Sequence, residues 1–179
     1  MKTSQAFTDG KTSHEYRRDR FASVLSHFSL HQDHAFMDEV ISTYERTIMA
    51  SLQLVSGAVQ LLRRLRDLGK KIAVITEGPQ DAQEITVERL RISGYIDFLA
   101  TTNRFGVAKT EGLFAKVLEH LDVRASDMIY IGDSEQRDTI PATSQAIFSI
   151  HYDSNEHVAL DSRPLKVNTL WKLQHILVD

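Results

Sequence analysis

The stretch from residue 128 to residue 138 restricts the possible folds of this chain more than any other. It begins with the apolar run 128–131, which has the length and composition of a buried parallel strand. Gly132 ends the run, and the carboxylates of Asp133 and Asp138 follow it. Acids at the carboxyl end of a strand lie where open α/β sheets place their ligands. Two carboxylates that converge there indicate a hard cation such as Mg²⁺, and an acidic helix N-terminus is the alternative interpretation.

Strand-like and helical segments alternate over most of the chain. The expected strands are residues 72–75, 98–101, 128–131 and 147–151. The expected helices span about residues 14–28, 33–50, 56–69, 80–92, 111–121, 136–145 and 168–178. Because strands that alternate with helices form a parallel sheet covered on both faces, we predict an α/β fold. Its architecture is a three-layer αβα sandwich around a mostly parallel, Rossmann-like sheet.

Composition excludes several functional classes. The chain has 179 residues, of which 42% are hydrophobic and 25% are charged, as in a soluble globular protein. Its formal charge of −3 gives no overall attraction to nucleic acid or to an anionic membrane. The absence of cysteine excludes disulfides, thiolate catalysis and thiolate metal sites. No apolar run has the length of a membrane span and residues 1–10 are too polar for a signal peptide, so we expect a cytoplasmic protein.

Polar residues of three different types follow the expected strands. They are Thr76, Lys109 in a loop, and the pair Asp133 and Asp138. In a parallel sheet all the carboxyl ends open on one rim, so these residues can share a site. A hydroxyl and the N–H groups of a helix start suit a phosphate, and a lysine adds positive charge for the same anion. Considered alone, Thr76 has an ordinary explanation as a helix cap, and Lys109 has one as a solvated loop charge. The order in which these residues follow the expected strands favours a shared site.

These residues resemble the motifs of the haloacid dehalogenase (HAD) superfamily of hydrolases, most of which are Mg²⁺-dependent phosphatases. Residues 72–78 look like the second motif, residues 106–109 like the third, and residues 132–138 like the fourth. The resemblance implies that Thr76 binds the phosphoryl group, that Lys109 neutralises it, and that two acids hold Mg²⁺. The implied phosphate-binding residues are Thr76, Glu77, Gly78 and Lys109, and the implied metal ligands are Asp133 and Asp138.

The resemblance also implies a division of the chain and a class of ligand. The two helices expected before residue 55 stand where the family inserts a helical cap, which covers the site and selects the substrate. We therefore expect residues 14–55 to form a small cap, and residues 1–13 and 56–179 to form the HAD-like core. The expected partner is a small phosphorylated or anionic metabolite, without nucleic acid or membrane.

The first family motif is eroded in this sequence. In the family it is an apolar strand that ends in a nucleophilic aspartate, with an acid/base aspartate two positions later. Aligned on its Asp-Gly, this sequence has Phe7 at the nucleophile position and Asp9 at the acid/base position. Phenylalanine cannot attack phosphorus. Two smaller departures are Glu77, where similar relatives often carry asparagine, and Thr110, where a proline is common.

Three functions follow as alternatives. The first is hydrolysis of a small phosphomonoester through an aspartyl-phosphate if an aspartate is supplied, with Asp9, Thr76 and Lys109 as catalytic residues. The second is a non-catalytic descendant that binds Mg²⁺, an anion or a protein partner. The third is an enzyme without a covalent aspartate, in which Asp9, Asp133 or Glu77 acts as general acid or base.

The polar N-terminus also raises a question about the sheet. In the family the first strand lies between the strand that ends at Thr76 and the strand that ends at residue 131. An empty position would leave buried backbone groups unpaired, which is costly. The alternatives are that residues 2–7 fill the position, that the two flanking strands pair directly, or that a second copy of the chain enters. We expect residues 2–7 to fill it, because backbone hydrogen bonds do not depend on side-chain type.

Overall fold

The computed structural model of the chain describes residues 7–30, 33–154 and 165–178. The longer helices are α1 (Ser13–His27), α2 (His34–Ser51), α3 (Ala58–Asp67), α4 (Gln80–Arg89), α6 (Leu113–Leu121) and α8 (Leu170–Val178). The strands are β1 (Ala73–Thr76), β2 (Phe98–Thr101), β3 (Ile129–Gly132), β4 (Phe148–Tyr152) and β5 (Leu165–Val167). Short helical turns connect them, namely α5 (Thr102–Phe105), η3 (Lys109–Glu111), η5 (Glu135–Thr139) and α7 (Ile140–Ser144).

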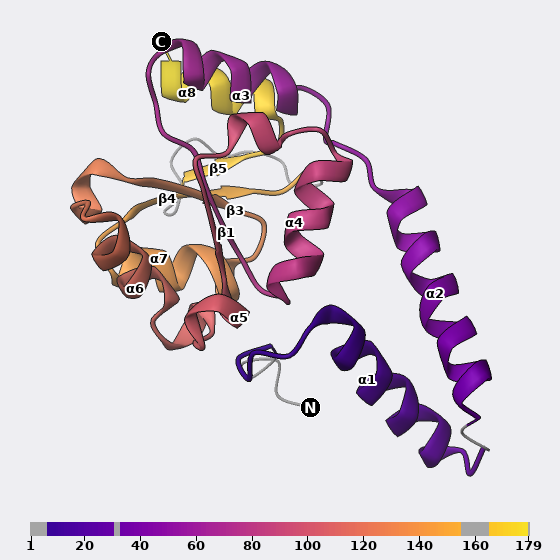
Figure 1. The fold of residues 1–179 in the computed structure, drawn as a ribbon. Coiled ribbons are helices and arrows are strands. Elements are labelled where there is room, and N and C mark those ends of the chain that lie inside the picture. The colour runs from indigo at the N-terminus through magenta and orange to yellow at the C-terminus, as the bar shows by residue number, and fades with distance from the viewer. Residues whose placement is uncertain (1–6, 31–32, 155–164, 179) are drawn as a thin grey trace.

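The strands form two separate parallel sheets within the described residues. β1 pairs with β2, with Ala73 opposite Phe98 and Thr76 opposite Thr101. β3, β4 and β5 form the second sheet in that order. Helices α3 and α8 lie on one side of the strands, and α6 and α7 lie on the other (Figure 1). The predicted α/β class with parallel strands is therefore confirmed, although the described strands do not join into one sheet.

The expectation for the first strand needs a correction at its last residue. Phe7 lies in a turn with φ of 69°, and it belongs to no strand. A positive φ redirects the chain, so the backbone cannot continue a strand through this residue. Residues 2–6 lie outside the described residues. The alternative of direct pairing is also absent, because β1 pairs only with β2 and β3 only with β4 within the described part of the chain.

Helices α1 and α2 form an antiparallel pair beside the sandwich (Figure 1). A capping box of Thr12 and Glu15 starts α1, and the Asp33 side chain caps α2. The pair packs through Phe21 and Tyr44, whose ring centroids are 5.5 Å apart. In the described residues no helix is long and apolar enough to cross a bilayer. The assignment of residues 14–55 as a cap domain stays a prediction.

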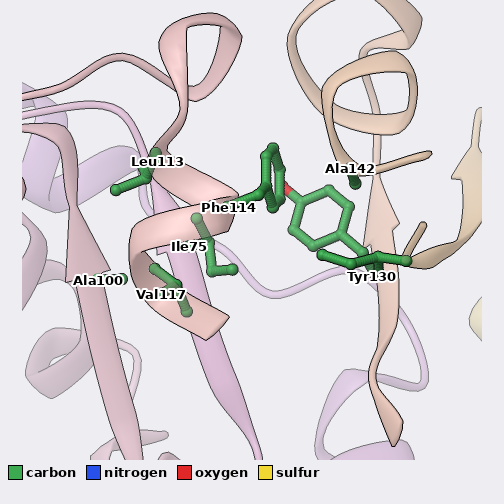
Figure 2. Close-up of a cluster of buried hydrophobic side chains, with 8 residues drawn as sticks. Ile75, Ala100, Leu113, Phe114, Val117, Tyr130 and Ala142 are labelled. Atoms are coloured by element: carbon green, nitrogen blue, oxygen red, sulfur yellow. The ribbon is translucent and has the colours of Figure 1, made fainter. Parts of the chain in front are cut away.

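Two hydrophobic clusters hold the sandwich together. The first gathers around α6 and joins both sheets; it contains Ile75, Ala100, Leu113, Phe114, Val117, Tyr130, Ala142 and Ile147. Figure 2 shows Leu113, Phe114 and Val117 of α6 grouped with Ile75 and Ala100, and the Phe114 ring beside Tyr130 of the second sheet. The second cluster packs α3 and α8 onto the second sheet only; it contains Leu61, Ile150, Val167 and Leu173. Helix α6 is thus the element whose side chains span both sheets.

Candidate functional site

The loops that follow β1 and β3 meet at one edge of the molecule. Arg137 Nη1 lies 3.5 Å from Glu77 Oε2, which connects the loop after β1 to η5. Lys109 Nζ forms an ion pair with Asp138 Oδ1, which connects η3 to η5. We call residues 76–78, 109 and 132–138 the rim. Among the predicted site residues, the structure therefore brings Lys109 into contact with Asp138 and places Glu77 beside the same turn.

Asp138 is the centre of the rim contacts. Its side chain is buried, and three groups donate hydrogen bonds to the carboxylate. The Lys109 ammonium and the Tyr130 hydroxyl reach Oδ1, the latter at 2.8 Å, and the Ser134 backbone N–H reaches Oδ2 at 3.0 Å. Lys109 is itself nearly buried, with 11% of its side chain exposed. Such a pair is expensive to break, because either partner alone would leave an uncompensated buried charge.

The local chain geometry explains this burial. The helix expected at 136–145 needs a correction in its first part only, because residues 135–139 form a π-helical turn while Ile140–Ser144 form the α-helix α7. The N–H groups of Asp138 and Thr139 both donate to the Ser134 carbonyl, so the turn is wider than an α-helical one. Gly132 makes room for the turn, because a Cβ at this position would lie 2.5 Å from the Asp138 Cβ.

Electrostatics keep Asp138 ionised and Tyr130 protonated. Burial alone would raise the pKa of Asp138, but the hydrogen bond and the positive charge of Lys109 outweigh it and lower this pKa below its ordinary value. Burial raises the pKa of the Tyr130 phenol, and the charge and hydrogen bond of Asp138 raise it further. The negative charges of Asp133 and Glu77 act in the same direction on the Tyr130 pKa.

Thr76 and Gly78 stand at the start of α4. The Thr76 hydroxyl has two long contacts, 3.4 Å to Gln83 Oε1 and 3.5 Å to the Glu77 carbonyl oxygen. Because both contacts are weak, the hydroxyl can rotate toward an incoming anion. The Gly78 N–H already donates to Thr102 Oγ1 at 3.1 Å. Of these two predicted phosphate-binding residues, Thr76 has the donor that is easier to recruit.

Asp133 and Asp138 differ in their surroundings, which bears on the predicted metal site. Asp133 is exposed, and its backbone oxygen lies 3.2 Å from His151 Nε2. Asp138 is buried and is already bound by Lys109. Within the part of the chain that the structure describes, no group of three or more His, Asp or Glu side chains could hold a metal ion. The donors present therefore fit Mg²⁺ only in part, and the metal site stays a prediction.

Phe7 and Asp9 lie beside the start of α1. The Phe7 ring packs edge-on against Tyr16, with the ring centroids 4.8 Å apart. Asp9 accepts a hydrogen bond from the Tyr16 hydroxyl, and Lys11 Nζ lies 3.4 Å from Asp9 Oδ2. The hydrogen bond from Tyr16, followed by the contacts with Lys11, lowers the pKa of Asp9. This carboxyl is therefore held as a carboxylate, which suits a proton acceptor better than a proton donor.

The site contains residues that sequence reasoning did not find. The sequence pattern predicts Tyr130 to be an apolar strand residue, yet its hydroxyl donates a hydrogen bond to Asp138. Arg137 pairs with Glu77, so the charge that Glu77 adds to the rim is partly compensated. A small cavity of about 120 Å³ lies where α1 and α2 approach the core; its lining includes Phe7, Tyr16, Arg17, Tyr44 and Pro79. Charge at a helix start was the available signal for Arg137, and no sequence signal pointed to Tyr130.

Comparison with curated proteins finds phosphatases. The chain is 25% identical over 138 residues to a glyceraldehyde 3-phosphate phosphatase of Methanocaldococcus jannaschii, covering 76% of this chain and 60% of that protein. It is 28% identical over 114 residues to a ribulose-1,5-bisphosphate 5-phosphatase of Halopiger xanaduensis, covering 63% of this chain and 48% of that protein. The chain thus spans about half to three fifths of the length of these two relatives.

Solved structures show the same fold. A HAD phosphatase from Thermococcus onnurineus superposes with a TM-score of 0.69 at 22% identity, covering 94% of this chain and 74% of that one. The HAD-hydrolase YfnB from Bacillus subtilis, a structure bound to magnesium, superposes with a TM-score of 0.73 at 21% identity, covering 96% and 75%. The family model for haloacid dehalogenase-like hydrolases matches residues 11–151, well over half of the chain. This chain belongs to the haloacid dehalogenase-like hydrolase family.

Proposed function

We propose that this chain is a phosphatase-type hydrolase of the HAD family that binds a small phosphorylated metabolite but, with Phe7 at the nucleophile position, turns phosphomonoesters over very slowly. The observation that carries the proposal is the meeting of the loops after β1 and β3 at the rim, through Lys109–Asp138 and Glu77–Arg137. The curated relatives that support it act, by their names, on phosphorylated three- and five-carbon compounds.

The residues of the rim have separate roles in this proposal. Lys109 supplies positive charge for a phosphate, and the Thr76 hydroxyl donates a hydrogen bond at the N-terminus of α4. Asp138, fixed by Tyr130 and Lys109, positions the lysine and does not touch the phosphate. Asp9, which lies outside the rim and is kept ionised by Tyr16, accepts a proton from the water molecule whose oxygen attacks phosphorus, and returns that proton to the alcohol oxygen as its bond to phosphorus breaks. Position 7 has no carboxylate, so no aspartyl-phosphate forms there.

Magnesium belongs to this proposal as a weak ligand. Asp133 offers an exposed carboxylate to the ion. The buried carboxylate of Asp138 would be a second ligand, either directly or through a water molecule. When bound, Mg²⁺ would neutralise phosphoryl oxygens. The support comes from the family, in which one solved structure is bound to magnesium. A cytoplasmic location stays a prediction as well.

Turnover of p-nitrophenyl phosphate and of glyceraldehyde 3-phosphate tests the proposal. We expect wild-type turnover in Mg²⁺ to stay close to that of a Thr76→Ala variant, and Phe7→Asp to raise it by roughly tenfold or more, since it restores a carboxylate nucleophile. The gain should disappear with EDTA and in Phe7→Asp/Asp133→Asn.

Inorganic phosphate should raise the melting temperature of wild type and not of Thr76→Ala. Robust wild-type turnover that depends on Mg²⁺ would refute the alignment and make another aspartate the nucleophile.

A non-catalytic role is the second candidate function, and the surroundings of Phe7 favour it. Phe7 packs on Tyr16 beside the small cavity, so this position contributes to packing and not to chemistry. This role predicts phosphate binding by wild type and no gain in Phe7→Asp. Turnover that is indifferent to EDTA would instead favour acid/base chemistry without metal, and replacement of Asp9 by Asn should then abolish it.

A further inference from the structure

The small cavity beside Phe7 is lined by positive charge. Its walls include Arg17 and Arg20 of α1 and Tyr44 of α2, and Pro79 borders it on the side of α4. Among the described residues, no aspartate or glutamate belongs to this lining. Since a pocket for a drug-sized ligand has about 300–1,000 Å³, a cavity of about 120 Å³ has room for one small group of a larger molecule. Its charge favours an anionic group.

The two arginines differ in how far their charge is compensated. Arg17 Nη1 lies 2.6 Å from Glu45 Oε1, and the Arg17 guanidinium lies 5.8 Å from the centroid of the Tyr44 ring. Arg20 is exposed, and it forms no ion pair with any residue that the structure describes. Arg20 is therefore the cation of the cavity that is available to a ligand.

The cavity adjoins the place proposed for the phosphoryl group. Phe7, at the nucleophile position, belongs to its lining. Pro79 also lines it and directly follows residues 76–78 of the rim. Because three extended residues span at most about 11 Å, Thr76 and Pro79 lie within that distance of each other. A short metabolite with its phosphoryl group at Thr76 can therefore reach the cavity with its other end.

Polar contacts fix the arginines relative to the start of α4. The Ser13 N–H donates to Asp81 Oδ1 at 3.0 Å, and the Ser13 hydroxyl donates to Asp81 Oδ2 at 2.8 Å. The same hydroxyl accepts a hydrogen bond from Arg17 Nη1 at 3.0 Å. The beginnings of α1 and α4 therefore lie together (Figure 1). Arg20, three residues after Arg17, shares its face of α1.

We propose that the small cavity binds a second anionic group of the substrate. The chain then prefers phosphorylated metabolites that also carry a carboxylate or a second phosphate over those with a single phosphate. Arg20 supplies the uncompensated charge, and Arg17, held by Glu45 and Ser13, forms the adjoining wall. This inference rests on the proposed function, because it needs the first phosphate at Thr76.

Isothermal titration calorimetry with matched probes tests the preference. Glyceraldehyde 3-phosphate and 3-phosphoglycerate share their carbon skeleton and phosphate, and differ by an aldehyde against a carboxylate. We expect wild type to bind 3-phosphoglycerate roughly tenfold more tightly or more, because the carboxylate accepts a charge-assisted hydrogen bond from Arg20. Ribulose 1,5-bisphosphate carries a second phosphate on a longer chain. The larger gain over glyceraldehyde 3-phosphate identifies the preferred group, and no gain for either probe would overturn the proposal.

Two arginine variants separate the cavity from the overall charge. Arg20→Gln should reduce the preference to about twofold or less, because glutamine has no charge. The matched control is Arg46→Gln, which removes an exposed arginine of α2 that contacts Thr43 and does not line the cavity. This control should keep the full preference. An equal loss in the two variants would show that overall charge recognises the second group, and would overturn the proposal.

Binding of inorganic phosphate separates this inference from the proposed function. If phosphate and glyceraldehyde 3-phosphate bind wild type and not Thr76→Ala, while neither probe with two anionic groups binds more tightly, the second anionic site is refuted and the proposed function stands. If phosphate does not bind wild type, or binds Thr76→Ala equally well, the proposed function fails and this inference fails with it.

Discussion

Asp138 accepts most of the side-chain hydrogen bonds at the rim, and its removal should lower the free energy of unfolding. Asp138→Ala would leave the nearly buried Lys109 ammonium and the Tyr130 hydroxyl without their acceptor. Breaking a buried pair in this way costs about 3–5 kcal/mol of unfolding free energy. The matched control is Asp127→Ala, which removes an exposed partner of Arg124 and should have little effect. Urea denaturation measures both, and similar losses in the two variants would contradict the role given to Asp138.

The Tyr130 phenol should make stability depend on alkaline pH. Its pKa is raised in the folded protein, chiefly by burial and then by Asp138, so the folded state keeps a proton that the unfolded state releases near pH 10. The stabilisation is complete below that pH and is lost as the pH rises above it. We expect the melting temperature of Tyr130→Phe to fall less steeply than that of wild type between about pH 9 and pH 11. Parallel curves would contradict this assignment.

The contact between Lys109 and Asp138 was predictable from the order of the motifs, whereas the contacts that packing decides were not, and the functional roles of the site residues stay a prediction. Sequence order predicts that Lys109 and Asp138 share one edge, and the structure brings these two residues into contact. The different burial of Asp133 and Asp138 depends on the π-helical turn. No residue pattern in 133–139 predicts that turn. Tyr130 reads as a core residue because one end of its side chain is apolar, and only the structure shows where the hydroxyl points.

The last residue of β3 must be glycine for the turn after it to close. In Gly132→Ala the new methyl group would lie 2.5 Å from the Asp138 Cβ, so either the strand or the turn has to move. We expect a loss of about 1–3 kcal/mol of unfolding free energy. The control is Gly94→Ala, where a Cβ meets nothing within 4 Å. Thermal unfolding should separate the two variants, and an unchanged Gly132→Ala would mean that the close approach relaxes without cost.

Most of the strands and longer helices were predictable, whereas β5 and the interrupted helix at 136–145 were not. The strand expected at 98–101 is observed as β2, and α6 lies within the helix expected at 111–121. The three-residue β5 was missed because its sequence is too short to show alternation, and its edge position supplies its pairing. The helix expected at 80–92 ends at Arg89, since Arg91 adopts φ of 56°, a left-handed conformation that ends a helical turn.

The two sheets differ in the hydrophobic contacts that stabilise them. The second sheet has its own cluster beneath α3 and α8, whereas β1 and β2 depend on the cluster around α6. Phe114 contacts Tyr130 edge-on with the ring centroids 4.7 Å apart, and it shares its cluster with Ile75 and Ala100 (Figure 2). β1 and β3, the strands of the two sheets that face each other, are not hydrogen-bonded to each other within the described residues. The coupling between the two sheets is therefore concentrated in a few side chains of α6.

Removing Phe114 should weaken that coupling before it unfolds either half. Phe114→Ala is expected to cost about 3–5 kcal/mol, and Leu173→Ala in the other cluster about 2–5 kcal/mol, so the two losses can be of similar size. Their hydrogen-exchange patterns should differ. In Phe114→Ala the amides of β1 and β2 should exchange faster than those of β4, because the first sheet opens on its own. In Leu173→Ala the amides of β4 and β5 should be affected most, because Leu173 packs against Ile150 and Val167. If Phe114→Ala accelerates all strands equally, the two sheets open as one cooperative unit and the uneven coupling inferred from the clusters is wrong.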